Sequence, residues 1–267
     1  MVKTLTLELL RDIWLMHQPS VDTYAVMAME YLSGKEISTG FFSSLKLPKV
    51  PENVALIPVA GALTKSDVCG WMGTRSISMM INEAAANKKV ESIIMLFENC
   101  PGGQVDGTEE FANAISYAKK KKPVMGAVSG LCASAGIWGL TQCTESFATS
   151  QTDLIGCIGV VGRIRNPAKA DADKKEFIEV YSDFSPDKNK EFSDASIYKE
   201  QILNPMALLF QSAVKNGRGD RLKITKEDVL TGKTYIAAKA KDAGLIDGIM
   251  PFNKIVNRSL SLAKSIK

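Results

Sequence analysis

Short apolar runs alternate with helical patterns through the middle of this chain, and that alternation limits the folds it can adopt. The runs with the length of a strand lie at 54–59, 90–97, 124–128 and 146–148. Amphipathic helical patterns, among them 76–86 and 107–119, separate them. Strands that alternate with helices predict a largely parallel sheet with helices on both faces, which is an α/β fold.

The first 50 residues differ from this pattern and predict a helical N-terminal extension with a linker. Pro48 and Pro51 mark the linker. The start of the chain lacks the apolar core of a signal peptide, because charged side chains interrupt it: Glu8, Arg11 and Asp12. We expect one globular domain over residues 51–267, since a chain of 267 residues that is 45% hydrophobic can bury a full core.

Charge and cysteine usage exclude several classes of protein. The net charge of +4 is spread along the chain, and the cluster Lys119–Lys122 ends a predicted helix, where cations suit the helix dipole. We therefore expect no nucleic-acid partner. Five cysteines without a C-x-x-C pair argue against a disulfide scaffold or a zinc site and favour the cytoplasm. No metal or cofactor is expected.

The segment from Pro123 to Thr144 is 22 residues without a charged side chain, which is the length of a membrane span. Its glycines and polar residues make a poor lipid-facing helix. A buried strand, a tight turn and a buried helix fit better, so we expect no membrane anchor.

Ser134 stands where that strand gives way to small residues and a helix. A serine hydroxyl is a weak nucleophile unless a nearby base takes its proton. The one histidine, His17, lies in the segment expected to be helical, far from Ser134 in sequence. A lone histidine near a helix end is more often structural than catalytic. A hydrolase built on Ser134 would therefore use a lysine as its base.

A glycine-rich turn, Pro101-Gly102-Gly103, follows the preceding strand. Consecutive glycines there can turn backbone amides towards an anion, although such a turn can also be a simple connection between strand and helix. Adjacent parallel strands place their C-terminal loops together. The turn and Ser134 are therefore expected to meet.

Four ordered motifs carry a resemblance to the signal peptide peptidase A family, which includes the phage head-maturation proteases, over residues 54–250. They are Asn99-x-Pro101-Gly102-Gly103, Ser129-Gly130 with Ala133-Ser134-Ala135-Gly136, Gly156-Cys157-Ile158-Gly159-Val160, and Gly244-Leu245-Ile246-Asp247. The resemblance implies the spiral ββα core shared with Clp proteases and crotonases.

The same resemblance implies a role for individual residues. Ser134 matches the family nucleophile, and the backbone amides of Gly103 and Ala135 match the oxyanion hole. The family base is a lysine about fifty residues later, which points to Lys188 in a Ser-Pro-x-Lys sequence, with Lys190 as the rival. Cys157 stands where the family often has a hydroxyl that orients the lysine.

The resemblance therefore implies a cytoplasmic serine endopeptidase with a Ser134–Lys188 dyad, closest to the phage capsid-maturation branch. Its partners would be protein or peptide substrates, including capsid or scaffold proteins, and copies of itself in a homo-oligomer. In an infected cell it would also lie inside a procapsid.

Other interpretations stay open at this stage. A crotonase-like acyl-CoA enzyme would use the same oxyanion amides without a serine nucleophile. A membrane signal-peptide-degrading peptidase and a non-catalytic assembly scaffold are further alternatives. Cys132 is a rival nucleophile, but thiolates normally form beside a histidine or in an electropositive site.

Overall fold

The computed structural model describes residues 14–17, 46–67, 72–162, 184, 190, 194–224 and 228–266. The main sheet has the strand order β2 (Val54–Ala60), β3 (Ser92–Cys100), β5 (Val124–Ala133), β6 (Glu145–Ala148), β9 (Gly248–Ile249). All neighbours along this path are parallel. The predicted α/β fold with a largely parallel sheet is confirmed.

Two further strands extend the sheet beside the end of β5. β7 (Leu154–Gly156) pairs in parallel with the last residues of β5, and β8 (Thr234–Ile236) pairs antiparallel with β7. The long strand β5 therefore has two different partners on the same side, β6 along its first half and β7 along its end. This arrangement places β7 next to the residue that follows β5, Ser134.

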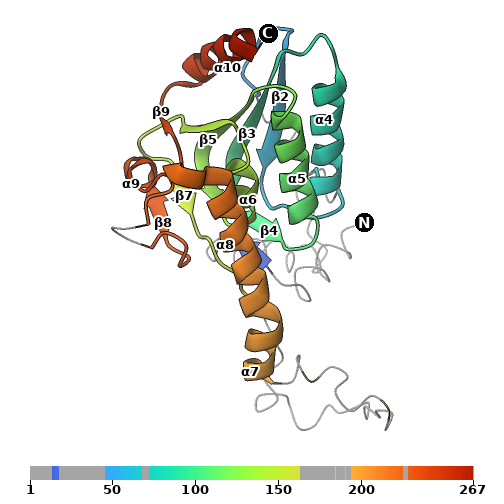
Figure 1. The fold of residues 1–267 in the computed structure, drawn as a ribbon, viewed down its shortest axis with the longest axis vertical. Coiled ribbons are helices and arrows are strands. Elements are labelled where there is room, and N and C mark those ends of the chain that lie inside the picture. The colour runs from blue at the N-terminus through green and yellow to red at the C-terminus, as the bar shows by residue number, and fades with distance from the viewer. Residues whose placement is uncertain are drawn as a thin grey trace, which may run out of the picture.

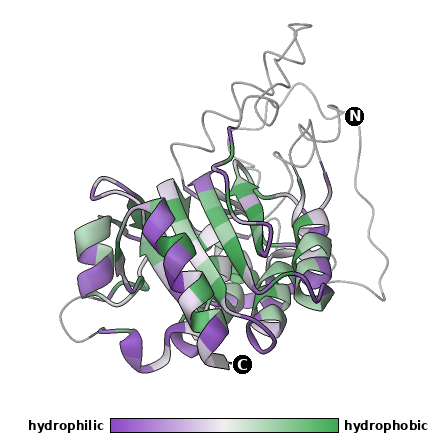
Figure 2. Ribbon diagram, turned by 90° about the horizontal axis from the view of Figure 1, so that it is seen from above, coloured by the Kyte–Doolittle hydropathy of each residue, from purple (hydrophilic) through white to green (hydrophobic). Residues whose placement is uncertain are grey.

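Helices cover both faces of the sheet (Figure 1). α4 (Thr74–Ala86) and α5 (Thr108–Lys119) pack on one face, and α10 (Phe252–Ile266) packs on the other. Side chains of β3 alternate between the two cores: Ile93, Met95 and Phe97 face α4 and α5, whereas Ile94 and Leu96 face α10. Figure 2 shows the apolar strands between helices whose outer faces are hydrophilic.

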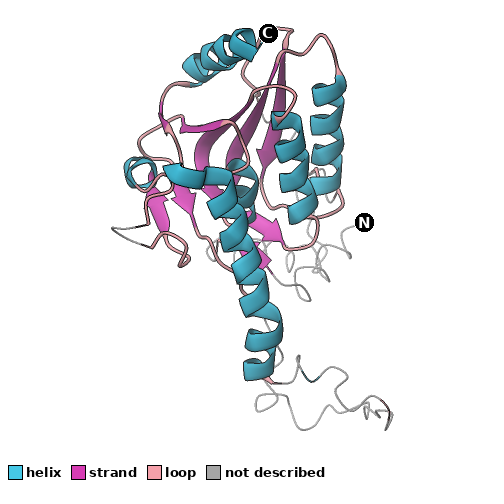
Figure 3. Cartoon of the chain, in the orientation of Figure 1, coloured by secondary structure: helices cyan, strands magenta, loops and turns pink. Residues whose placement is uncertain are grey.

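The C-terminal third adds a long helix that projects from the body (Figure 3). α7 (Ala195–Tyr198), a π-helical turn (Lys199–Leu203) and α8 (Asn204–Arg218) follow one another directly. The Asp194 side chain caps the start by accepting from the Ser196 and Ile197 amides. Phe210 fastens α8 to the body by stacking on Trp138, with ring centroids 5.0 Å apart. A 3₁₀ turn (Gly219–Arg221) and α9 (Ala237–Asp242) complete the helices.

The N-terminal extension contains a strand where we expected a helix. β1 (Trp14–Met16) pairs antiparallel with β4 (Gly102–Gln104) in a separate two-stranded sheet. The helical expectation is therefore wrong for these residues, because pairing with a distant strand overrides the local apolar spacing. The remainder of 1–45 lies outside the described residues, and the domain boundary near residue 50 stays a prediction.

The uncharged segment 123–144 is built into the interior. It forms β5, the turn at Ser134 and α6 (Ala135–Leu140), whose residues are all buried. Within the described ranges, no helix is both long and apolar enough to cross a bilayer.

A buried arginine explains the fourth sequence motif. The Arg218 side chain is 1% exposed and donates to both carboxylate oxygens of Asp247 at 3.0 and 2.9 Å and to the Gly244 carbonyl oxygen. Asp247 also accepts from the Ser146 amide at the start of β6. Burial raises the pKa of Asp247, but the hydrogen bonds and charge of Arg218 outweigh it and bring the pKa below its usual value. The motif therefore ties α8 to the sheet.

Asp247→Asn should lower the free energy of unfolding by about 3 kcal/mol near neutral pH, because it leaves the Arg218 charge buried and unpaired. Since the folded-state pKa of Asp247 is lowered, its stabilisation is complete above the unfolded pKa of about 3.9 and is lost as the pH falls below it. Urea denaturation at several pH values measures the difference. Glu145→Gln, which breaks the more exposed Arg258–Glu145 pair, is the control and should cost under about 1 kcal/mol. Equal losses in the two variants would contradict the prediction.

Candidate active site

Ser134 occupies a sharp turn between β5 and α6. Its backbone has φ 54° and ψ −118°, a conformation that residues other than glycine rarely adopt. The turn is held on both sides: the Ser134 amide donates to the Gly156 carbonyl oxygen at 2.9 Å, and the Ser134 carbonyl accepts from the Ile137 amide at 2.8 Å. Such a backbone costs about 1–3 kcal/mol and is typically kept where function needs it.

The Ser134 side chain is buried, and its hydroxyl is left without a partner. The residue is 1% exposed, and Oγ has no hydrogen bond to any described residue. A buried polar atom without a partner costs about 1–3 kcal/mol. A hydroxyl in this state is available to donate to a base or to attack a bound group, and it is unusual for a serine that only supports packing.

The glycine turn contacts the β2–α4 connection through backbone atoms, and the neighbouring Gln104 side chain accepts from the Lys65 amide. Leu63 N donates to Gly102 O at 2.9 Å, and Gln104 N donates to Leu63 O at 2.8 Å. A Cβ atom on Gly103 would lie 1.8 Å from the Leu63 carbonyl oxygen. Gly103 therefore has to be glycine, because the two backbones approach too closely for any side chain.

A second close contact joins the end of β3, just before this turn, to β5. Asn99 has a positive φ of 43°, and its Oδ1 lies 2.2 Å from where a Cβ on Gly130 would be. Gly130 itself has φ 81° and donates its amide to Asp153 Oδ1 at 2.9 Å. The first two sequence motifs are thus two sides of one contact.

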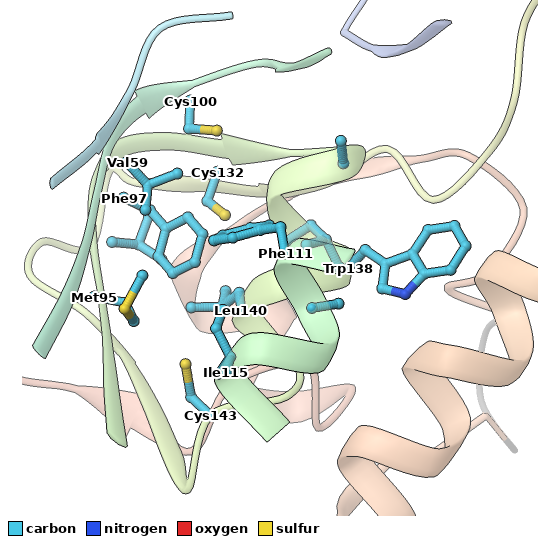
Figure 4. Close-up of a cluster of buried hydrophobic side chains, with 14 of the residues drawn as sticks. Val59, Met95, Phe97, Cys100, Phe111, Ile115, Cys132, Trp138, Leu140 and Cys143 are labelled. Carbon is cyan, nitrogen blue, oxygen red and sulfur yellow. The ribbon is translucent and has the colours of Figure 1, made fainter. Parts of the chain in front are cut away.

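The loops after β3 and β5 meet, as the sequence predicted. Cys100 and Cys132 lie opposite each other in the two strands. A Cβ on Gly136, in the first turn of α6, would lie 2.9 Å from Cys100 Sγ. Figure 4 shows both thiols beside the apolar side chains that support this end of the sheet, including Phe97 and Phe111.

The buried thiols are unsuited to nucleophilic attack. Cys132 is fully buried, and burial raises its pKa well above the usual value, helped by the neighbouring Cys100 and Cys143. Burial likewise raises the pKa of Cys100 to about 12. Both remain protonated at neutral pH, so the rival interpretation of Cys132 as the nucleophile is disfavoured.

The two residues expected to form the oxyanion hole lie at these two turns: Ala135 directly follows Ser134, and Gly103 belongs to the glycine turn. Ala135 is the first residue of α6, and the first amides of a helix have no partner within it. Gly103 lies in the middle of β4 and faces Leu15 of β1 in the two-stranded sheet. The two expected residues therefore come from adjacent loops, one of them paired with the N-terminal segment.

Cys157 lies directly beside the Ser134 turn. It follows Gly156, whose carbonyl holds the Ser134 amide, and its own amide donates to the Lys233 carbonyl oxygen at 2.7 Å. The residue is half-buried with φ 59°, and burial raises the pKa of its thiol. The expected lysine-orienting position is thus next to the serine, with a neutral thiol in place of a hydroxyl.

The structure leaves the identity of the base as a prediction. Lys188 lies outside the described residues. Lys190 is described and exposed, and its carbonyl accepts from the Asp194 amide at 3.0 Å just before α7. The choice between Lys188 and Lys190 therefore stays a prediction.

The structure brings His17 to the glycine turn, which sequence reasoning missed. The His17 backbone amide donates to Pro101 O at 2.8 Å. Burial of the imidazole ring lowers the pKa of the His17 side chain. Its Nδ1 and Ser134 Oγ are both buried without a partner among the described residues, so these two atoms are not hydrogen-bonded to each other. The apolar run Trp14-Leu15-Met16 was the available signal, and it is compatible with a strand as well as a helix.

Comparison with curated proteins gives relatives along most of the chain. Protease 4 of Salmonella typhi is 27% identical over 233 residues, which cover 83% of this chain and 36% of that protein. Protease 4 of Haemophilus influenzae is 26% identical, with 80% of this chain and 35% of that protein covered. The chain resembles SppA-like peptidases. It spans about a third of the length of these two relatives.

A phage protein is also similar. The head-tail preconnector protein GP5 of Enterobacteria phage P21 is 28% identical over 118 residues, which cover 42% of this chain and 23% of that protein. No family model matches the chain. These relatives support the resemblance stated from the motifs.

Solved structures similar to the chain include a membrane-bound stomatin-specific protease in complex with a substrate peptide. It has a TM-score of 0.45 and 15% identity, and covers 77% of this chain and 78% of that chain. An enoyl-CoA hydratase/isomerase family member has a TM-score of 0.45 and 17% identity, and covers 82% of this chain and 74% of that chain.

Among the described residues, no group of three histidine, cysteine or acidic side chains is placed to hold a metal ion.

Gly103→Ala should lower the free energy of unfolding by about 1–3 kcal/mol, because the added methyl group clashes with the Leu63 carbonyl. Gly159→Ala is the matched control, since a Cβ there would have its nearest neighbour at 3.8 Å. Urea denaturation of both variants provides the measurement. A Gly103→Ala chain as stable as Gly159→Ala would show that the close contact with Leu63 does not exist in solution.

Proposed function

We propose that the protein is a serine endopeptidase that hydrolyses peptide bonds through Ser134 and Lys188. The observation that carries the proposal is the buried, unpartnered Oγ of Ser134 on a strained turn beside the glycine turn. A structural serine would find a hydrogen-bond partner, and a simple connection would not need a positive φ at serine. The similarity to Protease 4 supports the same class.

In the proposed acylation step, the neutral amine of Lys188 takes the proton of Ser134 Oγ as Oγ bonds to the substrate carbonyl carbon. The carbonyl oxygen gains the negative charge, and the amides of Gly103 and Ala135 donate to it. The C–N bond then breaks as the Lys188 ammonium gives its proton to the leaving amine. In deacylation, the Lys188 amine takes a proton from water as the water oxygen bonds to the acyl carbon. The bond from that carbon to Ser134 Oγ then breaks, and the Lys188 ammonium returns the proton to Oγ.

The biological role proposed for this activity is maturation of capsid or scaffold proteins in a phage or prophage. The similarity to a phage head-tail preconnector protein supports this branch. Partners would then be capsid or scaffold substrates and other copies of the chain. Portal and major capsid genes beside the coding gene would support the role, and a neighbourhood without any phage gene would count against it.

Ser134→Ala should lower proteolysis by about a thousandfold or more, because nucleophile and base act as a unit. A fluorophosphonate probe should label the wild-type chain on Ser134, as mapped by mass spectrometry. Ser261→Ala, which removes an exposed hydroxyl on α10, is the control and should label like wild type. Equal labelling of Ser134→Ala and wild type would refute the proposed nucleophile.

Lys188→Met should abolish proteolysis, whereas His17→Ala should not lower it. The kcat/KM of the wild type should rise with pH, because the free-enzyme lysine must lose its proton to act as the base. Lys241→Met, on the surface of α9, is the matched control and should retain activity. Loss in His17→Ala with the fold preserved would overturn the lysine assignment, and loss in Lys190→Met but not in Lys188→Met would move it by two residues.

A further inference from the structure

β4 has two edges, and the chain fills each of them with a different segment. On one edge, Gly102 and Gln104 exchange hydrogen bonds with Leu63. On the other edge, β1 pairs antiparallel with Leu15 opposite Gly103. Hydrogen-bonded and non-bonded pairs alternate in an antiparallel ladder, so the bond from His17 N to Pro101 O makes Leu15 and Gly103 the next bonded pair. The Gly103 amide thus faces the Leu15 carbonyl.

This pairing places an extended segment of the chain on an amide that the proposed mechanism needs free. Peptides in extended conformation bind proteins by adding a strand to such an edge, and main-chain hydrogen bonds supply the affinity. β1 makes the same kind of contact. A carbonyl oxygen of β1 occupies the donor that would hold the oxyanion of a substrate.

β1 is also weakly anchored for a strand. The ladder between β1 and β4 has only three residues in each strand, and so short a pairing adds little stability by itself. Met16 is 4% exposed and supplies apolar burial. His17 opposes this gain, because its Nδ1 is buried without a partner among the described residues. The contacts suit a segment that can leave.

We propose that residues Trp14–His17 act as a built-in, displaceable occupant of the edge of β4 on which an extended peptide substrate would lie. The proposal rests on the proposed peptidase function, because only a peptidase would bind its substrate along that edge. In this arrangement the N-terminal segment competes with substrate within the same chain. Substrate must displace β1 before the Gly103 amide can serve an oxyanion.

The direct test measures peptide binding in a chain that cannot cleave. The probe is a fluorescein-labelled synthetic peptide that copies residues 12–19, and the background is full-length Ser134→Ala. Met16→Asp should expel β1, because it would bury a carboxylate without a partner. Leu47→Asp also replaces an apolar side chain with a carboxylate, but at a residue that is 42% exposed, and it serves as the control.

Fluorescence polarisation should show the probe binding about tenfold or more tightly to the Met16→Asp chain than to its Met16 parent. The apparent Kd of the parent equals the intrinsic Kd divided by the fraction of chains whose edge is free, and removing the internal competitor brings that fraction close to one. Leu47→Asp should bind like the parent. Equal or weaker binding to Met16→Asp would overturn the proposal.

Leu15→Pro, which removes a strand amide, is the second variant. Loss of the folded state in both variants would also overturn it, because a displaceable segment is not needed for folding.

Fluorophosphonate labelling of Ser134 in the otherwise wild-type chains separates the two proposals. Tighter peptide binding without any labelling would contradict the peptidase function and leave β1 as an occupant of the edge. Labelling of Ser134 with unchanged peptide affinity would contradict only the role of β1. Both results together, with faster labelling in Met16→Asp, are what the pairing of Leu15 with Gly103 predicts.

Discussion

The contact between Asn99 and Gly130 is the constraint on which the rest of the site depends. It lies between β3 and β5 where the register of their ladder shifts, and the Asn99 side chain fills the space that a side chain at position 130 would need. Just beyond this contact, Gly103 approaches Leu63 after β3, and Ser134 follows β5 into α6. The parallel sheet beneath them supplies the rigid base, since both strands are buried on both faces.

Polar groups at this end of the sheet divide into two kinds. Asp153 and Asp247 are held by several donors each, including the amides of Gly130 and Ser146, and these bonds fix loops and helices. Ser134 Oγ and His17 Nδ1 have no partner in the described part of the chain. In the described part of the chain, these two acids are thus held by several donors, whereas Ser134 Oγ and His17 Nδ1 are left unsatisfied, as expected where binding or chemistry takes place.

Strand spacing and turn chemistry made much of the fold predictable. The expected strands and helices agree with β2, β3, β5, β6, α4 and α5, and the small residues around Ser134 indicated a strand, a turn and a helix. β1 could not be predicted, because the strand state of Trp14–Met16 depends on pairing with Gly102–Gln104, far away in sequence. The contact of Asn99 with Gly130 was equally hidden, since sequence spacing gives no side-chain distances.

In the proposed mechanism, Ser134 attacks a peptide carbonyl whose oxygen then lies between the Gly103 and Ala135 amides. A crystal structure of the full chain after reaction with a peptide boronate tests it most directly. The mechanism predicts boron bonded to Ser134 Oγ and one boronate oxygen within hydrogen-bond distance of both amides. The proposed role of β1 predicts that the peptide lies on the edge of β4 in place of β1. Boron on another side chain such as Cys157, or a boronate oxygen that contacts neither amide, would contradict it.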